Sequence, residues 1–169
     1  VDWDRKGFDR TIKICNLLRS KGLNTTLTLI GASKKKKLPK WVKVYNFIDK
    51  NNKSSHKLIS NILLNSDFHT LMTKSEAFGV VFSEASSHGV YNIAPDIGGI
   101  RGVIKNNVNG KLFKDNVNNQ VIANYIYEIF KNKKNLKKKI LSTKTYYENY
   151  LDWKTIGANF NKMVKNLKR

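Results

Sequence analysis

The apolar residues of the chain recur at two kinds of spacing, which predict alternating helices and strands. From Phe8 to Arg19 the apolar positions Phe8, Ile12, Cys15 and Leu18 follow a helical period, and Gly22 supplies a stop. Runs that are β-branched or continuously apolar predict strands over Thr25–Ile30, Val42–Ile48, Asp67–Thr73, Val90–Ala94 and Lys111–Phe113. Helical spacing also predicts a helix over Ser54–Leu64, a helix of about ten residues between Gly79 and Gly89, and a helical tail from Val117 onward.

This alternation favours an α/β fold. Strands that alternate with helices form right-handed βαβ units, so we expect a Rossmann-like parallel sheet with helices on both faces. The 169 residues have the length of one domain, and no linker or internal repeat divides them. We therefore treat residues 1–169 as one domain.

The segment from Ser75 to Ala85 carries the most informative chemistry. Glu76 and Glu84 are eight residues apart, and Gly79 lies between them near the start of a predicted helix. In an open parallel sheet ligands bind at the carboxyl ends of the strands, and Glu76 lies just beyond such an end. The amides at the start of the helix suit a pyrophosphate, and Gly79 lets the backbone approach it closely. A carboxylate at Glu84 can accept hydrogen bonds from a ribose, and one at Glu76 from a hexose.

This segment resembles the glutamate–seven residues–glutamate motif of the retaining glycosyltransferases of family 4. Further landmarks agree with that family in order and spacing: Arg5-Lys6-Gly7, Leu29-Ile30-Gly31, His88-Gly89-Val90, Gly98-Gly99-Ile100 and Asn109-Gly110. The resemblance covers essentially the whole chain. It implies the C-terminal, nucleotide-sugar-binding half of an enzyme with the two-domain glycosyltransferase-B (GT-B) fold.

The resemblance also implies roles for individual residues. Lys6 would contact the diphosphate, with Arg5 as a second cation, while Glu84 would hold the ribose. Glu76 would hold the hexose hydroxyls and is the candidate catalytic residue. The full set of expected donor-binding residues is Arg5, Lys6, Tyr45, Asn46, Phe47, Glu76, Ala77, Phe78, Gly79, Val80 and Glu84, with the base near Tyr45–Phe47. The sequence departs from the family at Val1, where an arginine is usual, at Tyr91, where proline is usual, and at Arg101-Gly102, where Pro-Glu is common.

The net charge of +20 is the strongest compositional signal, with 32 basic residues against 12 acidic ones. Nearly all of the basic residues are lysines, in blocks such as Lys34–Lys37 and Lys131–Lys139, without interleaved arginine or aromatic residues. This pattern favours a solvated surface. Peripheral contact with an anionic membrane is the second interpretation, and specific nucleic-acid recognition is disfavoured. No apolar run approaches the roughly 20 residues that span a bilayer. We expect a cytoplasmic protein, and peripheral attachment at the inner face of the membrane is the additional hypothesis.

Metal and cofactor chemistry finds little support in the sequence. His56, His69 and His88 are scattered, and the single Cys15 lies on the predicted buried face of a helix. No Gly-x-Gly-x-x-Gly follows a strand, which disfavours a dinucleotide-dependent dehydrogenase. We expect no metal and no cofactor beyond the nucleotide sugar itself.

The expected activity is transfer of a hexose from a UDP- or GDP-sugar to a glycan or lipid-linked acceptor with retention, as in bacterial surface polysaccharide synthesis. The chain opens at Val1 without a strand, so we expect the first strand and an N-terminal acceptor domain to belong to a longer enzyme, and residues 1–169 alone to be inactive. Two alternatives remain. One is a sugar-nucleotide epimerase or phosphorylase of similar fold, and the other is a non-enzymatic basic binding module.

Overall fold

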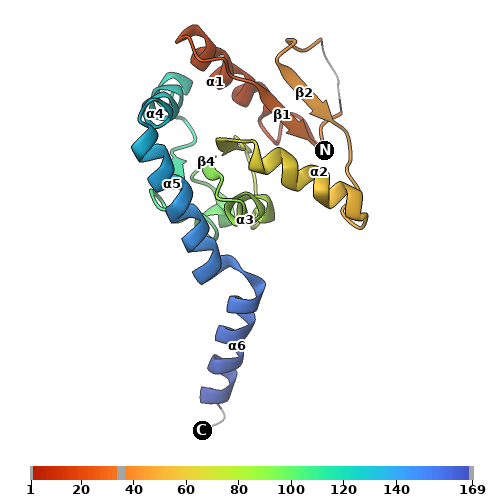
Figure 1. Ribbon diagram of the computed structural model, residues 1–169, viewed down its shortest axis with the longest axis vertical. Coiled ribbons are helices and arrows are strands. Elements are labelled where there is room, and N and C mark those ends of the chain that lie inside the picture. The colour runs from red at the N-terminus through yellow and green to blue at the C-terminus, as the bar shows by residue number, and fades with distance from the viewer. Residues whose placement is uncertain (1, 34–36, 168–169) are drawn as a thin grey trace.

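A computed structural model describes residues 2–33 and 37–167. The helices are α1 (Phe8–Ser20), α2 (Lys53–Leu64), α3 (Val80–Ser87), α4 (Asn119–Lys131), α5 (Lys133–Tyr146) and α6 (Trp153–Leu167). The strands are β1 (Leu27–Ile30), β2 (Val42–Tyr45), β3 (Phe68–Thr70), β4 (Tyr91–Pro95) and β5 (Gly110–Phe113). A 3-10 helix covers Gly98–Gly102, and a π-helical turn covers Tyr147–Leu151. The alternation that the sequence predicted is confirmed (Figure 1).

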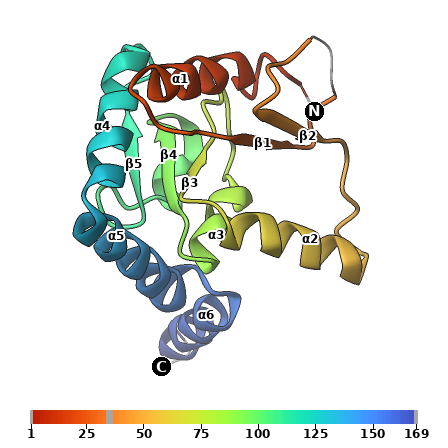
Figure 2. The same cartoon turned by 45° about the horizontal axis from the view of Figure 1, so that its top comes forward.

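All strand pairs are parallel, and the strands form two sheets. In the first sheet β1 pairs with β2, from Leu27 opposite Val42 to Ile30 opposite Tyr45. In the second sheet the order is β3-β4-β5. Helices α1 and α2 lie on opposite sides of β1 (Figure 2). The expected α/β fold with a parallel arrangement is therefore confirmed, but the described strands do not join into one continuous sheet.

The buried apolar residues form separate clusters that follow this division. The largest cluster joins α1 and α4 to the second sheet and includes Ile14, Ile93 and Ile126. Another packs Phe82 of α3 against Ala94 and the 3-10 helix. Around the first sheet the cluster is small and consists of Trp3, Phe8, Leu29 and Ala32.

Helix α2 is less buried than its pattern predicts. The helical spacing predicts that Leu58 and Ile62 face inward, with Leu63 as a further candidate. All three are only half-buried, and no residue of α2 is fully buried. This leaves the apolar face of α2 without a close-packed partner among the described residues.

The sequence of the C-terminal part places Tyr146, Tyr147, Tyr150 and Trp153 close together, which predicts core or interdomain packing of these rings. Tyr146 and Tyr147 do pack against the cluster around Phe82. Tyr150 and Trp153 are instead 63% and 72% exposed, because α6 extends away from the rest of the molecule and has no buried residue (Figure 1).

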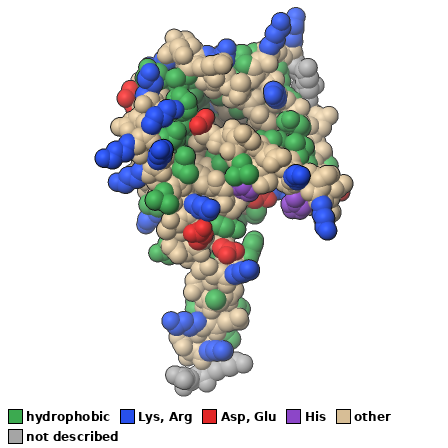
Figure 3. All heavy atoms as spheres, viewed as in Figure 1, with side chains coloured by type: hydrophobic (Ala, Val, Ile, Leu, Met, Phe, Trp, Pro, Cys, Tyr) green, Lys and Arg blue, Asp and Glu red, His purple; other side chains and the backbone are tan. Residues whose placement is uncertain are grey.

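The charged surface follows the composition. Lysine and arginine side chains are spread over the face shown in Figure 3, and the Lys131–Lys139 block lies at the end of α4 and along α5. Most of the Lys34–Lys37 block lies outside the described residues. Over residues 2–33 and 37–167, no helix combines the length and the apolar character needed to cross a bilayer.

Candidate functional site

Glu76 lies in the loop after β3, and Glu84 lies in the second turn of α3, as the sequence predicted. The centre of the site is an ion pair between Lys6 and Glu76, with 2.7 Å between Nζ and Oε2. Both side chains are largely buried, at 19% and 15% exposure. Lys6 lies in the loop before α1, and Glu76 in the loop after β3. Because 70 residues separate them in the chain, the fold itself brings this cation and this carboxylate together.

Backbone contacts hold the two loops together. The carbonyl oxygen of Arg5 accepts hydrogen bonds from the Lys74 amide at 2.7 Å and from the Thr73 hydroxyl at 3.0 Å. The Arg5 side chain donates to the carbonyl of Ser75 through Nη1 at 3.3 Å. The Arg5 guanidinium therefore already has a partner beside the predicted diphosphate position. No local pattern predicts these contacts, since they join segments about 70 residues apart.

The 3-10 helix at Gly98–Gly102 packs against the loop that contains Glu76. The Gly99 amide donates to the Glu76 carbonyl at 3.2 Å. A Cβ on Gly99 would lie 1.8 Å from the Ala77 carbonyl oxygen, so only glycine allows this approach. The Gly98-Gly99 pair therefore packs against the backbone of Glu76 and Ala77 and holds it in place.

Helix α3 begins in this loop. Gly79 precedes it in the left-handed region, and no side chain caps the first turn. The amides of such an uncapped turn, together with the helix dipole, favour a bound anion. Phe78 and Val80 beside it are about half exposed, at 48% and 49%. The residues on either side of Gly79 are therefore accessible, whereas Gly79 itself is buried.

A buried polar network holds α3 against β4. Asn92 of β4 donates through Nδ2 to the Phe82 carbonyl at 3.2 Å and to the Ser86 hydroxyl at 2.9 Å. Its Oδ1 lies 2.9 Å from Nδ1 of His69. Burial lowers the pKa of the His69 imidazole. Asn109 donates to the same Ser86 hydroxyl at 3.2 Å. Residues of β3, of β4 and of the loop before β5 thus hold the helix whose N-terminus faces the site.

Glu84 occupies the position in α3 that the sequence assigned to a ribose ligand. Its carboxylate pairs with Lys50, which lies in the loop between β2 and α2. Sequence reasoning missed Lys50, because 34 residues separate the pair. The topology could have indicated Lys50. Its loop follows the carboxyl end of β2 as the Glu76 loop follows that of β3, and in parallel strands these ends lie at the same edge of the sheet.

A cavity of about 940 Å³ reaches this site. The predicted binding residues that line it are Lys6, Tyr45, Phe47 and Glu84, and Lys50 and Val81 line it as well. Glu76 does not line the cavity, but it pairs with Lys6, which does. The other predicted residues that do not line it are Arg5, Asn46, Ala77, Phe78, Gly79 and Val80. Phe47 is 85% exposed and Tyr45 is half-buried at the end of β2, so the expected base region is open. The ligand contacts of all these residues stay predictions.

Two departures from the family motif have structural partners. Tyr91 is buried, and its hydroxyl donates to the Gly110 carbonyl at 2.8 Å, which ties β4 to β5. Arg101 bonds Asp96 through two nitrogens, with 2.8 Å between Nη2 and Oδ2. This hydrogen-bonded guanidinium holds the pKa of Asp96 below its usual range. Both residues therefore serve local structure beside the site.

Comparison with solved structures places this architecture among GT-B glycosyltransferases. The chain superimposes on sucrose-phosphate synthase from Thermosynechococcus elongatus with a TM-score of 0.74 and 17% identity, over 97% of this chain and 43% of that one. It superimposes on Anabaena Alr3699/HepE in complex with UDP-glucose with a TM-score of 0.74 and 19% identity, over 96% and 46%. The pneumococcal O-GlcNAc transferase GtfA, in complex with UDP and GlcNAc, gives a TM-score of 0.75 and 18% identity, over 98% and 34%. The chain thus spans less than half the length of these proteins and has the fold of one half of a GT-B enzyme.

Comparison of sequences identifies the family. No curated protein matches the chain significantly. The family described as glycosyl transferases group 1 matches residues 3–145. This range includes both glutamates, Lys6 and the Gly98-Gly99 pair. The chain therefore belongs to the group 1 glycosyltransferases.

Proposed function

We propose that this chain is the donor-binding half of a glycosyltransferase that moves a hexose from a nucleoside diphosphate sugar to an acceptor. The observation that carries the proposal is the Lys6–Glu76 pair beside the uncapped N-terminus of α3. One cation, one carboxylate and one helix terminus at the same strand ends match the diphosphate and the sugar of such a donor. The solved neighbours in complex with UDP-glucose or UDP favour a UDP-sugar over a GDP-sugar.

In the proposed reaction this chain stabilises the negative charge that develops on the leaving diphosphate. When the bond between the anomeric carbon and the diphosphate breaks, negative charge accumulates on the leaving phosphate. Lys6 and the first amides of α3 stabilise that charge, and they are held in place before the reaction by the contacts of Arg5 and Asn92. Glu76 orients the hexose hydroxyls and, through its ion pair, the Lys6 ammonium. We propose that this arrangement needs no metal ion.

The finer parts of the proposal rest on the motif. Retention of the anomeric configuration follows from the resemblance of the Glu76–Glu84 segment to the retaining family. A lipid-linked or glycan acceptor at an anionic membrane surface agrees with the lysine excess, and a neighbour, WaaG, is described as involved in lipopolysaccharide biosynthesis. The acceptor wall of the cleft belongs in this proposal to a second, N-terminal domain. Residues 1–169 then bind the donor but do not transfer its sugar.

Substitution of Lys6 tests the diphosphate contact. Lys6→Ala removes the ammonium beside the helix N-terminus, so we expect UDP to bind about 10-fold more weakly, while uridine changes by less than about 2-fold. Calorimetric titration in the presence of EDTA measures both ligands. Lys13→Ala on the exposed face of α1 is the matched control. Equal losses for uridine and UDP would remove Lys6 from the diphosphate site.

Substitution of Glu84 tests the ribose contact. Glu84→Ala removes a carboxylate that can accept two hydrogen bonds, so we expect nucleotide affinity to fall by about 10-fold or more. Lys50→Ala removes only the present partner of Glu84 and frees its carboxylate, so affinity should change much less. The same titrations with UDP and GDP measure both variants. Unchanged affinity of Glu84→Ala for whichever nucleotide the unaltered chain binds would contradict the assignment.

A further inference from the structure

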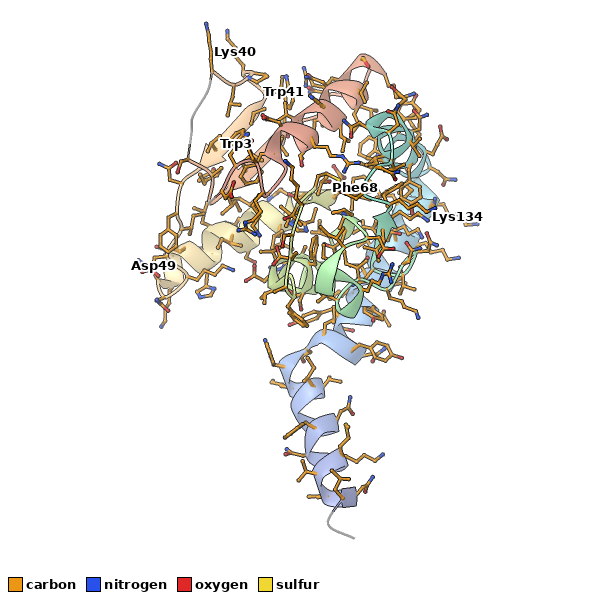
Figure 4. All side chains as sticks on the ribbon, turned by 180° about the vertical axis from the view of Figure 1, so that it is seen from behind. Trp3, Lys40, Trp41, Asp49, Phe68 and Lys134 are labelled. Atoms are coloured by element: carbon orange, nitrogen blue, oxygen red, sulfur yellow. The ribbon has the colours of Figure 1, made fainter. Side chains whose placement is uncertain are left out.

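The lysines of α5 differ in how firmly the structure holds them. Lys134, in the first turn of α5, points away from the body of the molecule (Figure 4). Lys139 is half-buried and folds over the ring of Tyr91, with 5.1 Å between Nζ and the ring centroid. Its Nζ also donates to the Asn107 carbonyl oxygen at 2.8 Å. Contacts with the ring and with the backbone therefore fix the position of the Lys139 ammonium.

A second ammonium group reaches the same asparagine from β5. Lys111 donates through Nζ to Oδ1 of Asn107 at 3.3 Å, and this Nζ lies 5.7 Å from the centroid of the Tyr125 ring. The hydroxyls of Tyr91 and Tyr125 lie 3.1 Å apart, so the two rings beneath the two ammonium groups are joined as well. Asn107 thus binds two lysine ammonium groups, one through its backbone and one through its side chain.

The positive charge around Asn107 has no carboxylate partner among the described residues. Lys138 lies next to Lys139 on α5, and burial together with the charges of Lys138 and Lys111 lowers the pKa of Lys139. Over residues 2–33 and 37–167 none of these three lysines forms an ion pair, and Glu128 on the neighbouring helix α4 pairs with none of them. Like charges that the fold brings together without a counterion favour a bound anion.

The lysines still have hydrogens to donate to such an anion. An ammonium group carries three N–H donors, and the contacts with Asn107 use one on Lys139 and one on Lys111. The remaining donors come from two elements, β5 and α5, and Lys138 adds its own. A phosphate group fits this arrangement because it offers three strong acceptor oxygens and a charge of about −1.5 to −2 near neutral pH.

We propose that Lys111, Lys138 and Lys139 form a binding site for a phosphate group. Asn107 and Lys111 lie at the amino end of β5, whereas Glu76 follows the carboxyl end of β3, which is parallel to it within the same sheet. The site is therefore at the opposite end of the sheet from the candidate donor site, and it does not depend on the proposed function. Its phosphate belongs to a lipid headgroup or to a soluble phosphate compound, since both present the same oxygens.

Titration with inorganic phosphate tests the site. In proton–nitrogen NMR spectra at constant ionic strength, we expect saturable shifts of the Asn107 and Lys111 amides, half complete at about 1 mM phosphate or less. Lys139→Met removes one ammonium and should raise this midpoint about 10-fold. Lys57→Met, at an exposed position on α2, should leave it within about 2-fold. Lys6→Ala should also leave these shifts unchanged, which separates this site from the candidate diphosphate site.

A variant at an exposed position guards against a folding defect. Lys138→Glu supplies a carboxylate that competes with phosphate for the other two lysines, so the midpoint should rise by about 10-fold or more. Sedimentation with vesicles of phosphatidylcholine, with and without phosphatidic acid, distinguishes the two sources of phosphate. Sedimentation only with phosphatidic acid, and its loss in Lys138→Glu, would assign a lipid headgroup.

Saturable phosphate binding without sedimentation would assign a soluble phosphate compound, and both results support the site. Shifts at Asn107 and Lys111 that are absent, or that rise linearly without saturation, would overturn the proposal. The same midpoint for Lys138→Glu as for the unaltered protein would overturn it as well.

Discussion

In the proposed two-domain transferase, replacement of Glu76 by glutamine should reduce sugar transfer about 100-fold or more while leaving the fold intact. Glutamine keeps the shape of the side chain but removes the charge that pairs with Lys6 at 2.7 Å. In the proposed complex the carboxylate accepts hydrogen bonds from hexose hydroxyls, and each charge-assisted bond contributes roughly 1.5–3 kcal/mol. Loss of two such bonds together with the misplaced ammonium accounts for the expected effect. The measurement is the rate of transfer from radiolabelled donor.

The matched control is Glu128→Gln, a change of the same kind at an exposed position on α4. It should leave transfer within about 2-fold, since surface substitutions of this kind are nearly neutral. Thermal unfolding of both variants separates a chemical effect from a folding defect. Transfer by Glu76→Gln at the rate of the unaltered enzyme would exclude Glu76 from the sugar site.

The largest expected effect on stability is at Gly7, which joins the Lys6 loop to α1. Its φ of 66° lies in the left-handed region, and a Cβ there would stand 1.8 Å from the Met72 carbonyl oxygen. Gly7→Ala therefore adds a backbone clash to an unfavourable conformation, and we expect it to lower the free energy of unfolding by about 3 kcal/mol or more. Denaturant unfolding measures this loss.

Gly22 provides a control with the same backbone conformation and no crowding. Its φ is 85°, and nothing lies within 4 Å of an added Cβ. Gly22→Ala should therefore lower the free energy of unfolding only by the penalty of a left-handed backbone, about 1–2 kcal/mol. If the two substitutions destabilised the chain equally, close packing of the Lys6 loop on the end of β3 would not be a determinant of the fold.

The sequence predicted the order and type of the elements well because these depend on local patterns. The period of Phe8, Ile12, Cys15 and Leu18 placed α1 to within one residue of its observed end. Strand limits were predicted less well. The run from Val42 to Ile48 is strand-like throughout, yet β2 ends at Tyr45, because its partner β1 offers only four residues for pairing. A strand ends where its neighbour ends, and a single segment does not carry that information.

The candidate site was also only partly predictable from the sequence. Glu76, Gly79 and Glu84 could be found from their spacing, since they lie in one short segment with a helix start between the two glutamates. The residues that contact them could not be predicted from spacing. Lys50 approaches Glu84, and the Arg5 backbone anchors Thr73, only after the sheets have brought distant loops to one edge. Side-chain exposure was equally inaccessible, as Trp153 shows, because it depends on what packs against α6.

We propose that a nucleoside diphosphate sugar binds with its diphosphate between Lys6 and the N-terminus of α3. A crystal structure of the protein with a UDP-sugar, or with the GDP-sugar if titration favours that base, tests this proposal directly. We expect phosphate oxygens within hydrogen-bond distance of Lys6 Nζ and of the amides at Gly79–Val81, with Glu84 on the ribose and Glu76 on the hexose. A nucleotide bound elsewhere on the chain, or a diphosphate at this edge of the sheet in contact with neither Lys6 nor α3, would contradict it.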